Sequence, residues 1–170
     1  MSSTTPETTA VINTGPVIAL VAALGSLDIL SRLYPKAILP REVWHELLAG
    51  GEDCLEVRAV RAAVGIEVGV DAVVVKNVFA VALDLGEAAV IQMALDRGID
   101  RVVLDERLGR KVAAQCGLCV TGTLGILLRA KRAGILSRLS PCVERMRQAG
   151  IRIAAPIVQS VLAEAGEAGR

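Results

Sequence analysis

Polar residues follow three short aliphatic runs that predict β-strands. Asn13-Thr14-Gly15 comes after residues 10–12, Asp105-Glu106-Arg107 after 102–104, and Thr121-Gly122-Thr123 after 119–120. The carboxyl ends of parallel strands meet at one edge of a sheet, and ligands bind in the crevice beyond that edge. The side-chain oxygens after the first two runs suit a hard cation, and the threonines after the third add hydroxyl groups. This pattern indicates a polar site at the carboxyl edge of a sheet.

For Glu87, the sequence indicates the direction in which the side chain points. It precedes Val90 and Ile91 by three and four residues in the segment GEAAVIQMAL, whose apolar stripe predicts the buried face of a helix. A first-turn acid is also favoured by the helix dipole, by roughly 0.3–1 kcal/mol, and this explains its charge without any ligand. It does not explain the inward direction, because a carboxylate against a core is costly unless a cation receives it.

A second acid lies on the segment REVWHELLAG, where Val43, Trp44 and Leu47 belong to the apolar face of a predicted helix. Helical periodicity alone does not choose between Glu42 and Glu46, and both can be solvated surface residues.

Several other kinds of chemistry are poorly supported. The chain has neither a P-loop motif nor a G-x-G-x-x-G motif after its first strand. His45, the only histidine, has no nucleophile in register for a catalytic triad. Cys116 and Cys119 have a metal-ligand spacing, but no second pair or nearby histidine would complete a zinc site. Asn13 stands where a phosphoaspartate enzyme would need an acid.

Composition and charge set the class of protein. The 170 residues are 53% hydrophobic with a mean hydropathy of +0.53, yet no uncharged apolar run reaches the roughly 18–20 residues of a membrane span. The polar first ten residues do not resemble a signal peptide, so we expect a cytoplasmic protein. The net charge of +1 hides an asymmetry: residues 42–106 carry thirteen acids against five bases, and residues 107–153 carry ten bases against one acid. Solvated helix faces or a polyanionic partner would each account for this asymmetry.

The order of elements predicts an α/β fold, a three-layer α/β/α sandwich with a mainly parallel central sheet of four or five strands. We expect a single domain at 10–165, with flexible ends at 1–9 and 166–170. Strands are predicted at 10–12, 37–39, 102–104 and 119–120, with a β-rich stretch at 66–75 and a possible edge strand at 151–153. Helices are predicted at 17–23, 27–33, 41–49, 55–63, 86–97, 107–116, 123–133, 141–149 and 157–165.

Taken together, these segments resemble the PIN-domain family of metal-dependent nucleases, which includes the toxins of many prokaryotic toxin–antitoxin pairs. The resemblance is to a branch that opens with a strand and NTSPLI and covers about residues 10–165 in the right order. The matching segments are Asn13–Ile18 (NTGPVI), Pro40–Leu47 (the P-x-x-V-x-x-E-L helix), Leu83–Ile91 (LDLGEAAVI), Asp105–Arg110 (DERLGR) and Val120–Gly134 (VTGTLGILLRAKRAG).

The resemblance implies one or two Mg²⁺ or Mn²⁺ ions held by Asn13, Glu46, Glu87 and Asp105, with Glu106 nearby. Glu46, Glu87 and Asp105 would be the catalytic acids, and the family's use of the helix acid favours Glu46 over Glu42. Substrate contacts are expected from Arg107 and Arg110 at the rim of the site and from the hydroxyl groups of Thr14 and Thr121. The metals would activate water for in-line attack on an RNA phosphodiester, and the basic helices would neutralise flanking phosphates.

The first ligand position departs from the common family pattern, which has Asp where this chain has Asn13 and Ser where it has Gly15. A carboxamide oxygen can bind Mg²⁺ but brings no charge, so we expect weaker metal affinity. The implied function is a metal-dependent, toxin-like ribonuclease with RNA and a small antitoxin as partners. The mean hydropathy of +0.53 exceeds what one core of this size needs, so we expect a second copy or the antitoxin to cover apolar surface, with residues 17–33 as the dimer face. The alternative is a PIN-fold RNA- or protein-binding module with weak or no catalysis. A small-molecule enzyme is a more distant third reading.

Overall fold

A parallel sheet forms the centre of the molecule. The computed structural model describes residues 9–167, and their five strands pair in the order β3-β2-β1-β4-β5, every pair parallel. The strands are β1 (Ala10–Ile12), β2 (Ala37–Leu39), β3 (Ile66–Val68), β4 (Arg101–Val103) and β5 (Cys119–Thr121). The three residues of β1 and of β2 are buried, as expected for strands covered on both faces. The predicted α/β class and parallel sheet are confirmed.

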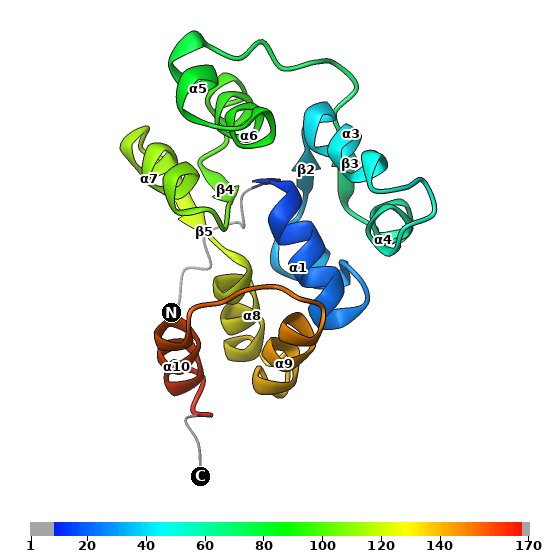
Figure 1. Cartoon of the computed structure of the whole chain (residues 1–170), viewed down its shortest axis with the longest axis vertical. Helices are drawn as coiled ribbons and strands as arrows, with labels where there is room; N and C mark the ends of the chain where they lie inside the picture. Colours follow the sequence, from blue (N-terminus) through cyan, green and yellow to red (C-terminus); the bar gives the residue numbers. More distant parts are fainter. Residues whose placement is uncertain (1–8, 168–170) are drawn as a thin grey trace.

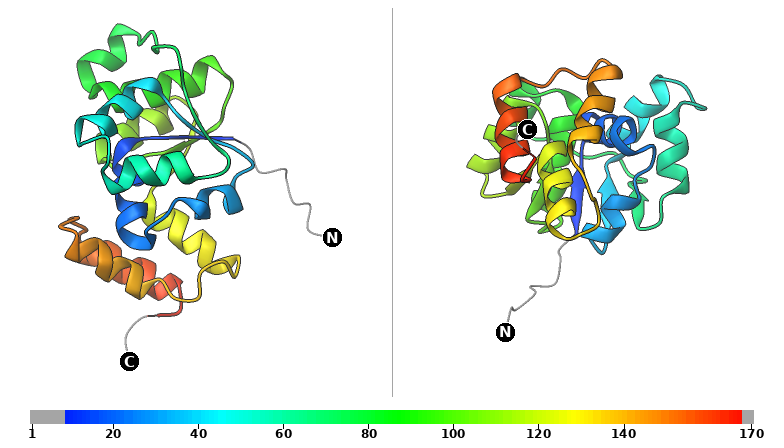
Figure 2. Two further views of the ribbon diagram at one scale, coloured as in Figure 1. Left: turned by 90° about the vertical axis from the view of Figure 1, so that its right-hand side faces the viewer. Right: turned by 90° about the horizontal axis from the view of Figure 1, so that it is seen from below.

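Helices cover both faces of the sheet, which gives the predicted three layers (Figures 1 and 2). On one side α6 contacts β1 and β4 and is flanked by α5 and α7. On the other side α1 packs against α9, α8 and α4, and α10 packs on α8, while α3 contacts both α1 and α6. The helices are α1 (Thr14–Leu24), α2 (Asp28–Leu33), α3 (Arg41–Ala49), α4 (Leu55–Ala62), α5 (Asn77–Ala82), α6 (Leu85–Asp96), α7 (Arg107–Gln115), α8 (Thr123–Arg132), α9 (Ser140–Gln148) and α10 (Ala155–Glu164).

The direction of winding reverses between β1 and β4. The chain runs from β1 outward to β2 and β3, then returns to place β4 on the other side of β1 and β5 beyond it. Connections therefore diverge at the carboxyl ends of β1 and β4, which is where ligands bind in open α/β sheets. Asn13 and Asp105 leave the sheet at these two neighbouring ends.

Several element boundaries differ from prediction. Helix α1 begins at Thr14, three residues before the predicted start, so Gly15 and Pro16 belong to its first turn. The predicted helix at 27–33 begins one residue later, at Asp28. The helix predicted at 123–133 does begin at Thr123 and ends at Arg132. The early start of α1 has a physical cause: polar and small residues that are typical of caps also fit inside a first helical turn.

Two larger differences concern the β-rich segments. The stretch at 66–75 is a strand only at 66–68. The Gly69 amide still donates to the Leu39 carbonyl, but beyond it Val70 and Val74 are exposed, and only Val73 and Val75 are partly buried against the core. Helix α5 then occupies Asn77–Ala82, which its β-branched residues did not suggest. Residues 151–153 form no strand but connect α9 to α10.

The predicted tails at 1–9 and 166–170 fall largely outside the described residues, since 1–8 and 168–170 are not among them. Within residues 9–167, no helix has the length and apolar character that a membrane crossing requires. The apolar side chains of 17–33 are mostly buried inside the chain, where α1 meets α9, and this leaves little apolar surface there for a dimer.

Candidate active site

Asn13 occupies a capping position without acting as a cap. It precedes α1, but its side chain makes no capping hydrogen bond. One reason lies in the sequence: Pro16, the third residue of the helix, has no N–H group for an asparagine to bind. Asn13 is 7% exposed, and its Oδ1 atom is buried without a hydrogen-bond partner among the described residues. A buried unpaired oxygen is costly, so this atom is available to a ligand.

Glu46 reaches the same place from α3. Its Oε2 atom accepts a hydrogen bond of 2.6 Å from the Thr14 hydroxyl, although the two residues are 32 positions apart. Thr14 is buried in the first turn of α1, whereas Glu46 is an exposed residue. Thr14 therefore fixes the direction of the Glu46 carboxylate towards the end of β1. In this contact Thr14 positions Glu46, a role that differs from the substrate contact predicted for Thr14.

The first turn of α6 brings the oxygens together. A Cβ atom placed on Gly86 would lie 3.0 Å from Asn13 Oδ1, 3.1 Å from Glu46 Oε2 and 3.5 Å from Asp84 Oδ1. Three side-chain oxygens from three separate segments thus surround one point, which stays open because residue 86 is glycine.

Asp84 belongs to this group and was not among the predicted site residues. It is the N-cap of α6, and its Oδ1 atom accepts a hydrogen bond of 2.8 Å from the Glu87 amide. The sequence offered a signal, because Asp84 lies inside the matched LDLGEA segment. An aspartate just before a helix is, however, usually explained by capping alone.

Glu87 points inward, as the stripe on its helix predicted. Its carboxylate lies against Gly109 of α7, in space that a larger residue there would fill, and Glu87 is only 4% exposed. Its Oε1 atom is buried and has no hydrogen-bond partner in the described chain. Burial raises the pKa of the Glu87 carboxyl, and the charges of Asp84, Glu106 and Glu46 raise it further, against a lowering contact with the Asp84 backbone.

Asp105 is held by α8. Its Oδ1 atom accepts a hydrogen bond of 2.7 Å from the Thr123 amide, and its Oδ2 atom accepts one of 2.6 Å from the Thr123 hydroxyl. A Cβ on Gly122 would come within 2.7 Å of Asp105 Oδ1, so glycine is needed for this close approach. Sequence reasoning noted the hydroxyl of Thr123 but did not place it beneath the acid.

These groups share one small hollow at the carboxyl edge of the sheet. A cavity of about 190 Å³ is lined by Asn13, Thr14, Glu46, Asp84, Asp105 and Glu106, together with Gly15, Pro16 and Ile18. Glu87 lies behind this cavity rather than on its surface, since its carboxylate is enclosed between α6 and α7. The structure therefore brings Asn13, Glu46 and Asp105 to one cavity, with Asp84 beside them and Glu87 set deeper.

Comparison with known proteins identifies the family. A family described as a PIN domain, DUF3368, matches residues 9–167. The chain belongs to this PIN-domain family. No curated protein and no solved structure matched the chain.

The oxygen set of this PIN domain fits a hard divalent cation. Carboxylate and carboxamide oxygens are the ligands that Mg²⁺ and Mn²⁺ prefer, and two of those present, on Asn13 and Glu87, are buried and unpaired. As the side chains stand, no three acids, histidines or cysteines within residues 9–167 are close enough to form a complete site. The point near Gly86 has two acids and an amide, so ion binding there needs a small inward movement or water ligands.

The predicted substrate residues are spread around the cavity. Arg107 is exposed at the start of α7, and Arg110 is half-buried with its Nη1 atom donating to the Leu104 carbonyl over 2.8 Å. Thr121 ends β5 and faces a neighbouring, larger hollow.

Much of the basic half of the PIN domain serves its own structure. Lys131 pairs with Glu167, Arg132 with Glu164, and Arg145 donates to the Ala23 carbonyl. Arg129 donates to the Leu33 carbonyl and stacks over Tyr34. The charge asymmetry in the sequence therefore overstates the number of bases left for a polyanion.

Proposed function

We propose that this PIN domain is a Mg²⁺- or Mn²⁺-dependent ribonuclease that hydrolyses phosphodiester bonds. The observation that carries the proposal is the meeting of oxygens from Asn13, Glu46 and Asp84 around one point, with Asp105 in the same cavity. The cavity lies where β1 and β4 end, at the position that open α/β sheets use for ligands.

A bound divalent ion would lower the pKa of a water molecule and offset the charge of the phosphate. The protein's part is to hold and orient the oxygens. Thr14 fixes the Glu46 carboxylate and Thr123 fixes the Asp105 carboxylate, each through a hydrogen bond of 2.6 Å. Burial and the neighbouring acids raise the pKa of Glu87, so the protein itself compensates a negative charge there poorly. A nearby cation would stabilise the ionised form of Glu87.

The second candidate function is an RNA-binding module with weak or no catalysis. Two observations favour it. Asn13 supplies a neutral ligand where the common family pattern has an acid, and three acids do not converge tightly in the described structure. Both observations lower the expected metal affinity, while the surface that would bind RNA is unaffected.

Cleavage of a mixed single-stranded RNA pool in Mn²⁺ separates the two functions. We expect cleavage by the wild type, and a loss of about 100-fold in Asp105→Asn, because removing one charged group from a metal or oxyanion site typically costs that much. Asp100→Asn is the matched control, since Asp100 is exposed and its hydrogen bond with the Cys119 amide uses only the Asp100 backbone carbonyl. If wild type and Asp105→Asn bind RNA equally and neither cleaves it, the nuclease proposal is wrong.

The biological setting is part of the same proposal. We infer that the enzyme acts on cytoplasmic RNA as the toxin-like component of a pair with a small antitoxin protein, as the family resemblance implies. Expression of the wild type alone in a bacterial host should slow growth, and Asp105→Asn should relieve this effect. Equal growth with both proteins, at equal expression, would contradict the toxin role. The cleavage experiment would still decide whether the protein is a ribonuclease.

A further inference from the structure

A second, larger hollow adjoins the acidic cavity. It has a volume of about 510 Å³, and three of its lining residues, Gly15, Asp105 and Glu106, also line the acidic cavity. The two hollows are therefore neighbours that meet around Asp105 and the two other shared residues. A volume of this size is within the range of pockets that bind small organic groups. A substrate held at Asp105 would extend into it.

The walls of the larger hollow are mainly apolar. Val120 and Leu124 contribute from β5 and α8, and Ile151, Ile153 and Ile157 contribute from the α9–α10 connection and α10. The first four side chains are partly buried, and Ile157 is 53% exposed. Apolar side chains facing each other across a gap suit a flat, uncharged ring system that is poorly hydrated on its two faces.

Positive charge lies at both sides of the apolar walls. Arg110 lines the hollow close to Asp105, since a Cβ on Gly122 would lie 2.8 Å from its Nη1 atom and 2.7 Å from Asp105 Oδ1. Arg152, an exposed residue, lines the hollow from the α9–α10 connection, whereas Arg110 comes from α7. Within residues 9–167 no hydrogen bond or ion pair of the Arg152 side chain is found, in contrast to Lys131, Arg132 and Arg145. Guanidinium groups in such positions pair well with phosphate.

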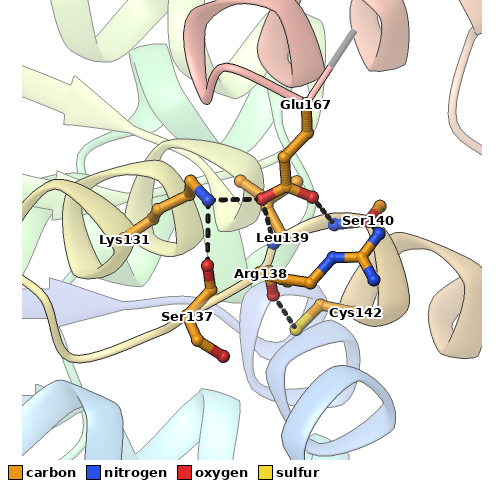
Figure 3. A network of polar contacts seen from close by, with 7 residues as sticks. All are labelled: Lys131, Ser137, Arg138, Leu139, Ser140, Cys142 and Glu167. Atoms are coloured by element: carbon orange, nitrogen blue, oxygen red, sulfur yellow. Dashed lines mark hydrogen bonds and ion pairs between the residues drawn. The ribbon is translucent and has the colours of Figure 1, made fainter. Parts of the chain in front are cut away.

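The outer wall is fixed in place by its own polar contacts. Glu167, just after α10, accepts hydrogen bonds from the backbone amides of Leu139 and Ser140 and pairs with Lys131 at 2.7 Å (Figure 3). Arg132 pairs with Glu164 at 3.0 Å on the same helix end. Helix α10 is thereby tied to α8 and to the start of α9. A wall held in this way is preformed, which reduces the entropy lost on binding.

We propose that this hollow, named here the α8–α10 cleft, binds the base of the nucleotide next to the scissile phosphate of a single-stranded RNA. The proposal rests on the ribonuclease function above. The apolar walls take the two faces of the base, and Arg110 and Arg152 pair with the phosphates on its two sides. A base in a duplex is stacked and paired, so it cannot enter the cleft without being unstacked. The cleft thus makes the enzyme selective for single strands.

Binding, measured without divalent ions so that no cleavage occurs, tests the cleft apart from the chemistry. The probe is a fluorescein-labelled single-stranded oligoribonucleotide of mixed sequence, followed by fluorescence anisotropy. Ile157→Glu should raise the Kd about tenfold, as expected when a base loses its stacking surface and meets a negative charge. Gln159→Glu is the matched control, because it puts the same charge on an exposed position of the same helix and should leave the Kd unchanged.

Arg152→Gln is a second test variant, and losing this exposed side chain should not affect folding. Losing one phosphate contact on a single strand should reduce the slope of log Kd against log salt by about 0.7. Arg147→Gln, an exposed arginine on α9 that does not line the cleft, should leave the slope unchanged. A blunt duplex of the same sequence should bind more weakly and should not respond to Ile157→Glu.

Equal affinity of wild type, Ile157→Glu and Arg152→Gln for the single strand would overturn the proposal and assign the cleft to another class of partner, such as a peptide. Equal response of the duplex and the single strand to Ile157→Glu would also overturn it. The same RNA incubated with wild type and Mn²⁺ reports the ribonuclease function separately: absence of cleavage there would contradict that function, while the binding arms would still decide the cleft.

Discussion

At the scale of single residues, the site depends on atoms that the protein itself does not satisfy. Asn13 has the right residue type and position for a helix cap, yet its Oδ1 atom is buried and unpaired. Thr14 next to it donates to Glu46 rather than to solvent. Together they explain why polar residues interrupt an otherwise aliphatic segment: one supplies a ligand oxygen and the next orients a second one.

Asn13→Asp should bind Mn²⁺ more tightly than the wild type. The change restores a negative charge beside Glu46 and Asp84, and one added charge near a cation at high effective dielectric is worth about 1 kcal/mol, or roughly fivefold in Kd. Isothermal titration calorimetry measures the Kd directly. Asn77→Asp adds the same charge at an exposed position on α5 and should bind like the wild type. Equal gains in both variants would show that the metal is not at Asn13.

Thr14→Val should weaken Mn²⁺ binding by about tenfold, the lower end of the range for losing a contact that orients a metal ligand. The side chain keeps its size, while the 2.6 Å hydrogen bond that fixes Glu46 is lost. Thr121→Val removes a hydroxyl in the neighbouring cleft and should leave the calorimetric Kd unchanged. An unchanged Kd in Thr14→Val would refute the positioning role of Thr14.

At the scale of elements, the start of α6 does two things at once. Asp84 caps the helix through the Glu87 amide, and the same turn directs Asp84, and Glu87 behind it, towards the ends of β1 and β4. The glycine between them leaves room for Asn13 and Glu46 to approach. Helix α6 begins at the active site, so its N-terminal amide groups face the cavity. The positive end of its dipole helps to keep acids there in their charged form.

Asp84→Asn should separate these two functions. Asparagine caps helices about as well as aspartate, so the melting temperature should change little. Mn²⁺ affinity should fall about tenfold, because one of the three oxygens near Gly86 loses its charge. Calorimetry and thermal melting of the same sample test both outcomes. A large loss of stability with intact metal binding would contradict this account of Asp84.

Glu167 holds α10 against the rest of the fold, and the contribution of its carboxylate to stability depends on pH. Burial opposes its charge, but hydrogen bonds from Lys131, Leu139 and Ser140 lower the pKa of Glu167 to about 2 from 4.5. A lowered pKa means that the stabilisation is complete above about pH 4.5 and is lost as the pH falls towards 2. Glu167→Gln should therefore lower the free energy of unfolding at pH 7 by about 2 kcal/mol.

Thermal melting monitored by circular dichroism checks this prediction. At pH 7 the melting temperature of Glu167→Gln should lie roughly 4–8 °C below that of the wild type. The difference should shrink as the pH falls below about 4.5, where the wild-type carboxyl begins to lose its advantage. Gln159→Glu, which changes an exposed position of α10, serves as the control. A difference that is constant with pH would rule out the proposed contacts.

The sequence predicted the elements that carry a strong pattern and missed those that depend on tertiary contacts. The strands at 10–12 and 37–39 and the helices at 41–49 and 107–115 follow from apolar runs and periodicity. Helix α5 was missed because its β-branched residues favour strands, and its one buried anchor, Phe79, gives no helical stripe. Asp84 was missed for a different reason: helix capping already explained it, and only coordinates show its second neighbour, Glu46.

At the scale of the whole molecule, the fold brings acids together at some cost to its own stability. The switch between β1 and β4 places Asn13 and Asp105 side by side, and α3 and α6 add three more acids. Burial and the neighbouring charges raise the pKa of Glu87, so its ionised form destabilises the metal-free protein. Because the pKa of Glu87 is higher in the folded than in the unfolded chain, its carboxyl favours folding below about pH 4.5. It opposes folding once the pH exceeds the raised pKa of the folded state.

Glu87→Gln should accordingly be more stable than the wild type when no metal is present. At pH 7 we expect its melting temperature to rise by roughly 2–4 °C, the effect of about 1 kcal/mol in a domain of this size. Addition of Mn²⁺ should raise the wild-type melting temperature, as any ligand of the native state does, and should have a smaller effect on the variant. A lower melting temperature in metal-free Glu87→Gln would contradict the electrostatic account.

The most direct test of the central claim is an anomalous difference map from a crystal soaked in Mn²⁺. The account predicts a peak in the cavity between β1 and β4, at direct ligand distance, about 2.1 Å, from the Asn13 amide oxygen and at least one of Glu46, Asp84 and Asp105. A fully occupied peak elsewhere on the molecule, or an empty cavity at saturating Mn²⁺, would contradict it.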